Sequence, residues 1–243
     1  MKMADLQVFD PAALLVRIDE ATRCLLGVAE ELDDAAMRAD SRLPGWSRGH
    51  VLTHVARNAD GGRRLLSWAR SGVEAHEYPS PEARAQEIED GAGRGAAELL
   101  ADVRASADRF AEEYARMPPA AWDRELRWTA GQRHRAARVA DSRLAELRLH
   151  CVDLAAGYTP EQWPPCFTEE LLPRVVAALD RRADAPAMRL HATDAGVRYA
   201  VGAGGPLVEG SQSALLGWLA GRSDGADLRV AEGDRLPLPP ALY

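Results

Sequence analysis

The sequence predicts an α+β protein in which a four-helix bundle is followed by a small α/β domain. The first ~160 residues contain long stretches with the apolar period of an amphipathic helix. Three prolines, Pro160, Pro164 and Pro165, then interrupt the chain. Beyond them, short alternating segments typical of strands lie between helical ones. We therefore place the bundle in residues 1–163 and the small domain in residues 164–243.

Composition and charge exclude several classes of protein. The chain has 243 residues, of which 47% are hydrophobic and 28% charged, as in soluble globular proteins. Its net charge of −7 and the absence of a basic block argue against nucleic-acid binding. Asp5, Asp10 and Pro11 break the N-terminal segment before an apolar run of signal-peptide length, and no stretch approaches the ~20 residues of a membrane span. We expect a cytoplasmic monomer with no nucleic-acid or membrane partner.

Four predicted helices form the bundle, and their ends carry recognisable signals. They cover residues 10–32, 47–72, 80–117 and 137–156. Asp10 and Pro11 form an N-cap and first-turn pair for the first helix, and Ser47 is the expected cap of the second. Gly157 lies just beyond the fourth helix. The connector at 120–136 alternates briefly around a glycine turn, which is typical of a short extended segment.

The small domain is predicted to mix helices and strands. Its elements, in order, are a helix at 168–184, strands at 187–194, 196–202 and 206–210, a helix at 211–222, a strand at 226–233 and an extended tail at 237–243. Ser211 is the expected N-cap of the second helix. Arg222 follows that helix in a polar Gly-Arg-Ser-Asp-Gly turn, so we expect its side chain to be exposed.

A carboxylate and an imidazole are paired on the fourth predicted helix. Glu146, His150 and Asp153 fall within about 60° of one another around the helix axis, between flanking leucines. In an apolar setting they need each other, a metal or another partner, although the spacing is also typical of a surface pair. The second helix adds a histidine from its apolar face, beside Val51 and Val55. Facing helices often build metal sites, and two imidazoles with one carboxylate suit Zn²⁺, Fe²⁺ or another divalent ion.

Three neighbours of these residues have open roles. His50 lies one turn before His54 and is either a fourth ligand or, as we favour, a capping and hydrogen-bonding residue. Asp153 either orients a ligand as a hydrogen-bond acceptor or bonds to a nearby loop. Cys151 points about 100° away from His150 around the helix, so we expect a small buried residue and no thiol ligand.

Four longer stretches carry a family resemblance. They are LPGWSRGHVLTHVARNADGGRRLLSWARSG, SPEARAQEIEDGAG, ELRLHCVDL and GSQSALLGWLAGRSDGADL. Together they resemble the mycothiol-dependent maleylpyruvate isomerases over nearly the whole chain. The first stretch is shared more widely, among DinB-like bundle proteins that use low-molecular-weight thiols, whereas SPEAR and LAGRSDG point to the isomerase. The resemblance implies a DinB-like four-helix bundle followed by a sterol-carrier-like α/β domain.

The resemblance also implies site residues and cofactors. The implied metal ligands are His54, Glu146 and His150. Arg222 is implied as the catalytic arginine, although from the residues alone it is a cation that favours the C-terminal end of a helix. The implied cofactors are Zn²⁺ or another divalent metal, and mycothiol. The connector after Trp122 and residues 157–167 match the family less clearly and are candidates for lining the substrate cavity.

The implied reaction is the cis–trans isomerisation of maleylpyruvate to fumarylpyruvate, in aromatic degradation through gentisate. Reversible addition of a thiol leaves a single bond that rotates freely, and a metal lowers the pKa of that thiol. Arg222 would stabilise the enolate or hold a carboxylate. The partners are then a small dicarboxylate and a low-molecular-weight thiol. Two alternatives remain: a mycothiol S-transferase on the same scaffold, and a non-enzymatic binding module with a structural metal.

Overall fold

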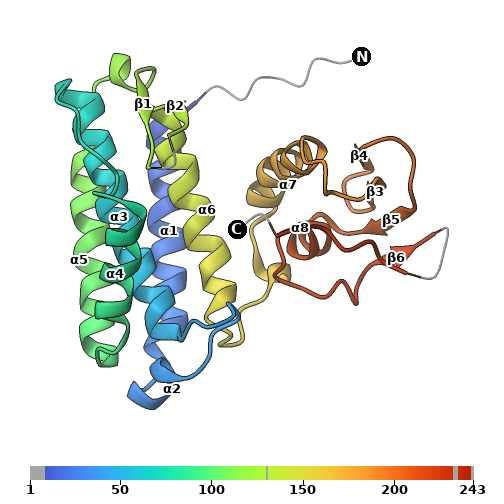
Figure 1. Ribbon diagram of the computed structural model, residues 1–243, viewed down its shortest axis with the longest axis horizontal. Coiled ribbons are helices and arrows are strands. Elements are labelled where there is room, and N and C mark those ends of the chain that lie inside the picture. Colours follow the sequence, from blue (N-terminus) through green and yellow to red (C-terminus); the bar gives the residue numbers. More distant parts are fainter. Residues whose placement is uncertain (1–8, 130, 232–234, 242–243) are drawn as a thin grey trace. The chain divides into compact units, whose positions relative to one another are not determined.

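The computed structural model describes residues 9–129, 131–231 and 235–241, and it confirms a mixed fold of helices and sheets (Figure 1). The chain divides into two compact units, Met1–Gly157 and Tyr158–Tyr243, whereas the proline cluster placed the division after Trp163. Among the described residues, no helix is both long and apolar enough to cross a membrane. Residues 1–8, on which part of the expectation about a targeting segment rests, lie outside the described residues.

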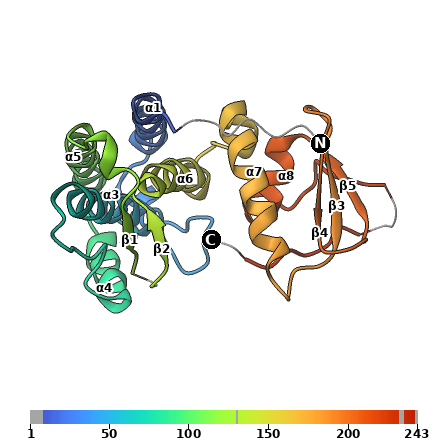
Figure 2. The same ribbon diagram turned by 90° about the horizontal axis from the view of Figure 1, so that it is seen from above.

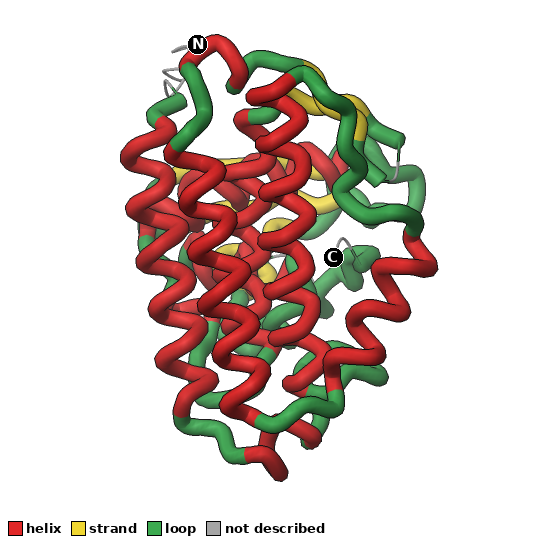
Figure 3. The backbone as a smooth tube through the Cα atoms, turned by 90° about the vertical axis from the view of Figure 1, so that its left-hand side faces the viewer, coloured by secondary structure: helices red, strands yellow, loops and turns green. Residues whose placement is uncertain are grey.

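The first unit is a bundle of four long helices that run side by side (Figure 3). They are α1 (Pro11–Glu30), α3 (Arg48–Ser71), α5 (Ala96–Ala115) and α6 (Ala137–Asp153). Helix α3 packs against both α5 and α6, and α1 packs against α6 and α5. The core between them is aliphatic and fully enclosed, with Leu25, Leu52, Leu66, Val103 and Leu147 at its centre. Each such side chain contributes about 1.5–3 kcal/mol by leaving water.

The predicted helix signals for α1 and α3 are confirmed. The Asp10 carboxylate accepts hydrogen bonds from two backbone N–H groups of the first turn of α1. Ser47 caps α3 in a capping box, in which His50 supplies the reciprocal contact. Helix α3 ends at Gly72, whose φ of 81° is a left-handed conformation that glycine adopts without strain. These contacts fix both ends of α3, the helix that carries His54.

Two features of the bundle differ from the prediction. The single helix expected over 80–117 is two helices, α4 (Pro81–Ala92) and α5, because the glycine-rich turn after Ala92 ends one helix and lets the chain reverse. A short helix, α2 (Asp34–Arg38), lies between the first two predicted helices, where no element was predicted, and the Asp33 side chain caps it. Because α4 and α5 are separate helices, α4 packs against the side of α3 that faces away from α5 (Figure 2).

The connector before α6 forms a small hairpin. After a short turn, η1 (Pro119–Ala121), strands β1 (Glu125–Arg127) and β2 (Arg133–Arg135) pair antiparallel, and Gly131 adopts a φ of 87° in the turn. This agrees with the predicted alternation around a glycine. Strand β1 contacts α3 and β2 contacts α6, so the hairpin lies over the two helices that carry the predicted metal ligands.

The second unit is a four-stranded sheet with two helices on one face (Figure 2). After η2 (Pro160–Gln162), its elements are α7 (Pro165–Asp180), β3 (Met188–Ala192), β4 (Val197–Val201), β5 (Leu207–Gly210), α8 (Gln212–Leu219) and β6 (Arg229–Val230). The strand order is β4-β3-β5-β6, with β3 and β5 parallel. Residues 232–233 of the predicted last strand and 242–243 of the tail lie outside the described residues.

Candidate metal centre

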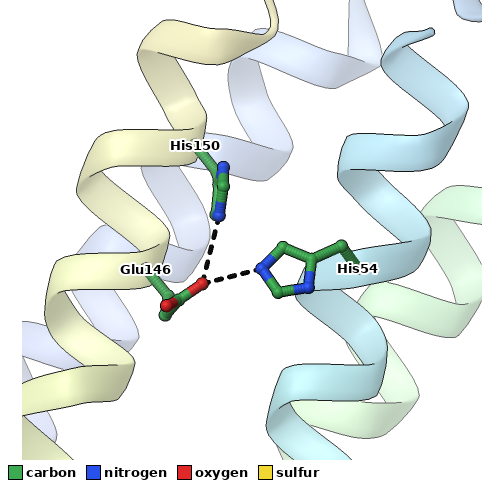
Figure 4. Close-up of side chains that lie close together, drawn as sticks. All are labelled: His54, Glu146 and His150. Atoms are coloured by element: carbon green, nitrogen blue, oxygen red, sulfur yellow. Dashed lines mark hydrogen bonds and ion pairs between the residues drawn. The ribbon is translucent and has the colours of Figure 1, made fainter. Parts of the chain in front are cut away.

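Two helices of the bundle bring three potential metal ligands together. His54 lies in the second turn of α3, and Glu146 and His150 lie one turn apart on α6 (Figure 4). One nitrogen or oxygen atom from each of the three lies within 4.8 Å of the other two. The i,i+4 spacing puts Glu146 and His150 on one face of α6, and this face packs toward α3. The structure thus gathers the three residues that the family resemblance implies as metal ligands.

The three side chains meet at one carboxylate oxygen. His54 Nε2 and His150 Nε2 donate hydrogen bonds of 2.8 Å and 3.1 Å to Glu146 Oε2. The two imidazole rings stand edge to face, with centroids 4.7 Å apart. Only 5% of His54 and 8% of His150 is exposed. Two imidazole nitrogens and a carboxylate oxygen therefore converge in a nearly dry place, and these are ligand types that Zn²⁺ and Fe²⁺ accept.

The protonation states of this cluster follow from burial and hydrogen bonding. Burial lowers the pKa of His54 to about 4, so its ring is neutral at physiological pH. Burial alone would raise the pKa of Glu146, but the hydrogen bonds from His150 and His54 outweigh it and hold that pKa well below its usual range. Burial works to lower the pKa of His150, yet hydrogen bonds to Asp153 and Glu146 raise it overall. A neutral imidazole and an ionised carboxylate are the forms that bind metals.

Asp153 orients His150 toward the cluster. Its Oδ2 atom lies 2.9 Å from His150 Nδ1, and the residue is only 1% exposed. A carboxylate behind a histidine fixes which ring nitrogen carries the proton and leaves the other nitrogen free to bind a metal. Of the two roles open to Asp153 from the sequence, the structure supports this one. The donor set and this supporting carboxylate together fit a divalent cation.

His50 does not belong to the cluster. Its Nδ1 accepts a 3.1 Å hydrogen bond from the backbone N–H of Ser47, and its Nε2 lies 3.2 Å from Glu89 Oε2. Both ring nitrogens are thus used at the start of α3 and at α4, as the capping interpretation predicts. Trp46 lies beside His50 and His54, with its ring centroid 6.1 Å from that of His50 and 5.7 Å from that of His54.

No cysteine of the described residues belongs to the cluster. Cys151 is 1% exposed, as expected, and its hydrogen bond to Cys24 together with burial raises the pKa of its thiol. A raised pKa keeps Cys151 in the unreactive thiol form at neutral pH. Cys151, which follows the ligand candidate His150 in the chain, therefore supplies no thiolate there.

A cleft of about 320 Å³ opens beside the cluster. It is lined by His54, Asn58, Glu77, Tyr78, Pro81, Arg84, Trp128, Thr129, Gln132 and Glu146. Three of these residues come from the hairpin connector after Trp122, so that segment lines the cavity next to the cluster, as its weaker match to the family suggested. A cleft of this size is in the range of sites that bind small molecules.

Two charged residues of the cleft were not identified from the sequence. Arg84 Nη2 donates a 3.0 Å hydrogen bond to His54 Nδ1, and its guanidinium lies over the Tyr78 ring at 5.6 Å. Glu77 accepts a 3.1 Å hydrogen bond from Thr129 Oγ1, and burial raises the pKa of its carboxyl group. Arg84 lies inside the SPEARAQ stretch that resembles the family, which was the one sequence signal for it. Residue spacing gave no signal for Arg84, because Arg84 lies on α4 whereas His54 lies on α3.

Arg222 lies in the second unit, just after α8. Its Nη1 atom donates a 2.7 Å hydrogen bond to the carbonyl oxygen of Ala220, and only 3% of the residue is exposed. The expectation of an exposed side chain is therefore wrong. Gly221, with a φ of 75°, turns the chain so that the guanidinium folds back on the end of α8. This contact matches the role that the residues alone suggested, a cation at a helix C-terminus.

Comparison with known proteins gives a consistent result for both units. The family model described as Mycothiol maleylpyruvate isomerase N-terminal domain matches residues 18–155, and the MDMPI C-terminal domain model matches residues 162–240. No curated protein gives a significant match. Two similar solved structures are crystal structures of a mycothiol-dependent maleylpyruvate isomerase, one of them a histidine-to-alanine mutant, with TM-scores of 0.91 and 0.90. Each is 26% identical, and each match covers 98% of this chain and 100% of the other.

Proposed function

The chain belongs to the mycothiol-dependent maleylpyruvate isomerase family, and from this premise we propose that it isomerises maleylpyruvate to fumarylpyruvate with mycothiol as cofactor. The observation that carries the proposal is the cluster of His54, Glu146 and His150 beside the cleft, in which both histidines are buried and Glu146 is half-buried. We further propose zinc as the metal, gentisate degradation as the pathway, and a cytoplasmic monomer with no nucleic-acid or membrane partner.

In this proposal the cluster holds the metal and the chain supplies no thiol of its own. His54, Glu146 and His150 would hold the divalent cation, which would supply the acidification of a bound thiol. Reversible addition of that thiol to the double bond would permit rotation about the bond. The ring of His54 is neutral and Glu146 is ionised, and Asp153 keeps His150 Nε2 turned toward them.

Other residues act on the substrate. Tyr78 and Trp128 line the cleft and limit the water beside the reacting carbons, which strengthens electrostatic interactions there. We assign to Arg222 the stabilisation of negative charge on the pyruvoyl oxygen, or the binding of a carboxylate, on the strength of the LAGRSDG resemblance. Its hydrogen bond to Ala220 shows a structural use of the same side chain, so the two roles need separate measurement.

A direct assay tests the proposed function. Zinc-loaded protein is mixed with maleylpyruvate and mycothiol, and proton NMR follows the cis and trans vinyl signals while free thiol is titrated. We expect fumarylpyruvate to accumulate with no net loss of thiol. Stoichiometric thiol loss would instead identify a mycothiol S-transferase. No conversion in the presence of both zinc and mycothiol, or full conversion without thiol, would overturn the proposal.

A further inference from the structure

Arg84 has a special position in the cleft. Among the described residues that line it, Arg84 is the single side chain with a permanent positive charge. Its guanidinium carbon lies over the ring of Tyr78, 5.6 Å from the ring centroid, and only 4% of Tyr78 is exposed. A planar guanidinium offers five N–H donors that match the two oxygens of a carboxylate.

The guanidinium of Arg84 is not committed to a protein carboxylate. Among the described residues, its contacts are His54 Nδ1 and Tyr78, both the ring and, by a hydrogen bond, the hydroxyl group, and no ion pair with an aspartate or glutamate is formed. Other arginines of the bundle are paired in this way: Arg57, Arg70, Arg94 and Arg109 each bind a carboxylate of a neighbouring helix. The guanidinium of Arg84 therefore has N–H groups that can donate hydrogen bonds to a ligand in the cleft.

Metal binding would release Arg84 from His54. A guanidinium only donates hydrogen bonds, so His54 Nδ1 accepts from Arg84 and the ring proton sits on Nε2, which faces Glu146. A metal ligand must present a lone pair at Nε2, which moves the ring proton to Nδ1. Two donors then face each other at the Arg84–His54 contact, and that hydrogen bond is lost. The N–H group that bonded to His54 can then bind a ligand, and the contact of the guanidinium with Tyr78 is unaffected.

Metal binding would also change the net charge of the cleft in favour of an anionic ligand. Glu77 and Glu146 line it together with Arg84, so carboxylates outnumber the guanidinium when no cation is bound. A divalent cation at the cluster turns this negative excess into a positive one. We infer that Arg84 binds a carboxylate of the substrate in the metal-loaded protein and so determines its preference for anionic substrates. The identity of that carboxylate rests on the proposed function; the anion site itself rests on the geometry.

Direct binding of fumarate, a simple dicarboxylate, tests the inference. Zinc-loaded, thiol-free protein is titrated by ligand-observed NMR, and zinc content is measured for every variant. We expect Arg84→Gln to keep its zinc and to raise the Kd for fumarate about 10- to 100-fold, since a charge-assisted hydrogen bond is lost. Arg84→Lys should recover part of the affinity, because it restores the charge without the planar fork. The KM for maleylpyruvate should rise with the fumarate Kd, and kcat should change less.

Arg64→Gln is the matched control. Arg64 lies over the same Tyr78 ring, at 5.9 Å, but it donates to the backbone oxygen of Glu77 and is not among the residues that line the cleft. It should bind fumarate like the unmodified protein. The inference is overturned if Arg84→Gln binds fumarate normally with an unchanged KM, or if it loses zinc. Failure of the unmodified protein to isomerise maleylpyruvate, with Arg84-dependent fumarate binding intact, would reject the proposed function and leave the anion site standing.

Discussion

The two units bury ionisable side chains for different reasons. In the bundle, His54, His150 and Asp153 are buried and are bonded to other ionisable side chains. In the small unit, Arg222 is buried and bonded to the carbonyl of Ala220 at the end of α8. Burying such groups costs free energy unless they are paired. A buried cluster of ionisable side chains that bond to one another therefore indicates a site, whereas the contact of Arg222 with a helix end also has a structural use.

The largest expected effect comes from the bundle cluster. His54→Ala and His150→Ala should each lose the bound metal and reduce turnover by about 1,000-fold or more, because the thiol is then no longer held and acidified. The folded bundle should persist, since neither side chain caps a helix. Metal analysis and the isomerase assay check this result. A chelator should lower the Tm of the unmodified protein but leave that of His54→Ala unchanged, because a ligand stabilises only the protein that binds it.

His50→Ala is the matched control for this comparison. His50 lies on the same helix, one turn before His54, but its ring belongs to the capping box. Its loss should cost about 1 kcal/mol of stability and leave both metal content and turnover intact. Full metal content in His54→Ala and His150→Ala, or metal loss in His50→Ala, would show that the cluster is assigned to the wrong residues.

The next largest effect is expected at Arg222, where an effect on catalysis would show that this buried arginine is more than structural. Arg222→Ala should reduce kcat/KM by about 100-fold if the guanidinium stabilises charge in the transition state, and it should also lower the Tm because the end of α8 loses a donor. Arg222→Lys separates the two roles. A lysine can still donate to the carbonyl of Ala220, so the Tm should recover, but it lacks the planar fork, so activity should not. If Arg222→Lys recovered both the Tm and the activity, or if Arg222→Ala kept near-normal turnover, Arg222 would have a structural role only.

A smaller effect is expected behind the cluster. Asp153→Asn should keep the fold and weaken metal binding about 10- to 100-fold, because an amide cannot hold the His150 ring as a carboxylate does. Competition with a chromogenic zinc chelator measures the change. Unaltered zinc affinity in this variant would mean that Asp153 supports α6 and does not orient a ligand.

Much of the bundle was predictable because its helices bury one face along their whole length. The apolar period predicted α1, α3 and α6, and capping residues such as Asp10 and Ser47 marked where helices begin. The break between α4 and α5 was missed, because the polar stretch there has the composition of a continuous helix and only the glycines after Ala92 signal the turn. Helix α2 was missed because five residues are too few to show a period.

The site residues likewise include some that were predictable from the sequence and some that were not. Glu146 and His150 were predictable because their i,i+4 spacing puts them on one face of a helix. Arg84 was not, because it meets His54 only through the packing of α4 on α3, which no spacing within either helix shows. The burial of Arg222 was misjudged for a related reason: a glycine turn after a helix looks solvent-exposed in sequence, while the structure folds the side chain back on the helix end.

X-ray absorption spectroscopy at the zinc edge tests the central claim most directly, namely that the cluster holds a metal on which the thiol binds. The zinc-loaded protein alone should show only nitrogen and oxygen neighbours, from two imidazoles and one carboxylate. Addition of mycothiol should introduce one sulfur neighbour at about 2.3 Å, and this change should be absent from His54→Ala. A spectrum without sulfur in protein that is turning over maleylpyruvate, or a sulfur neighbour before any thiol is added, would contradict the account.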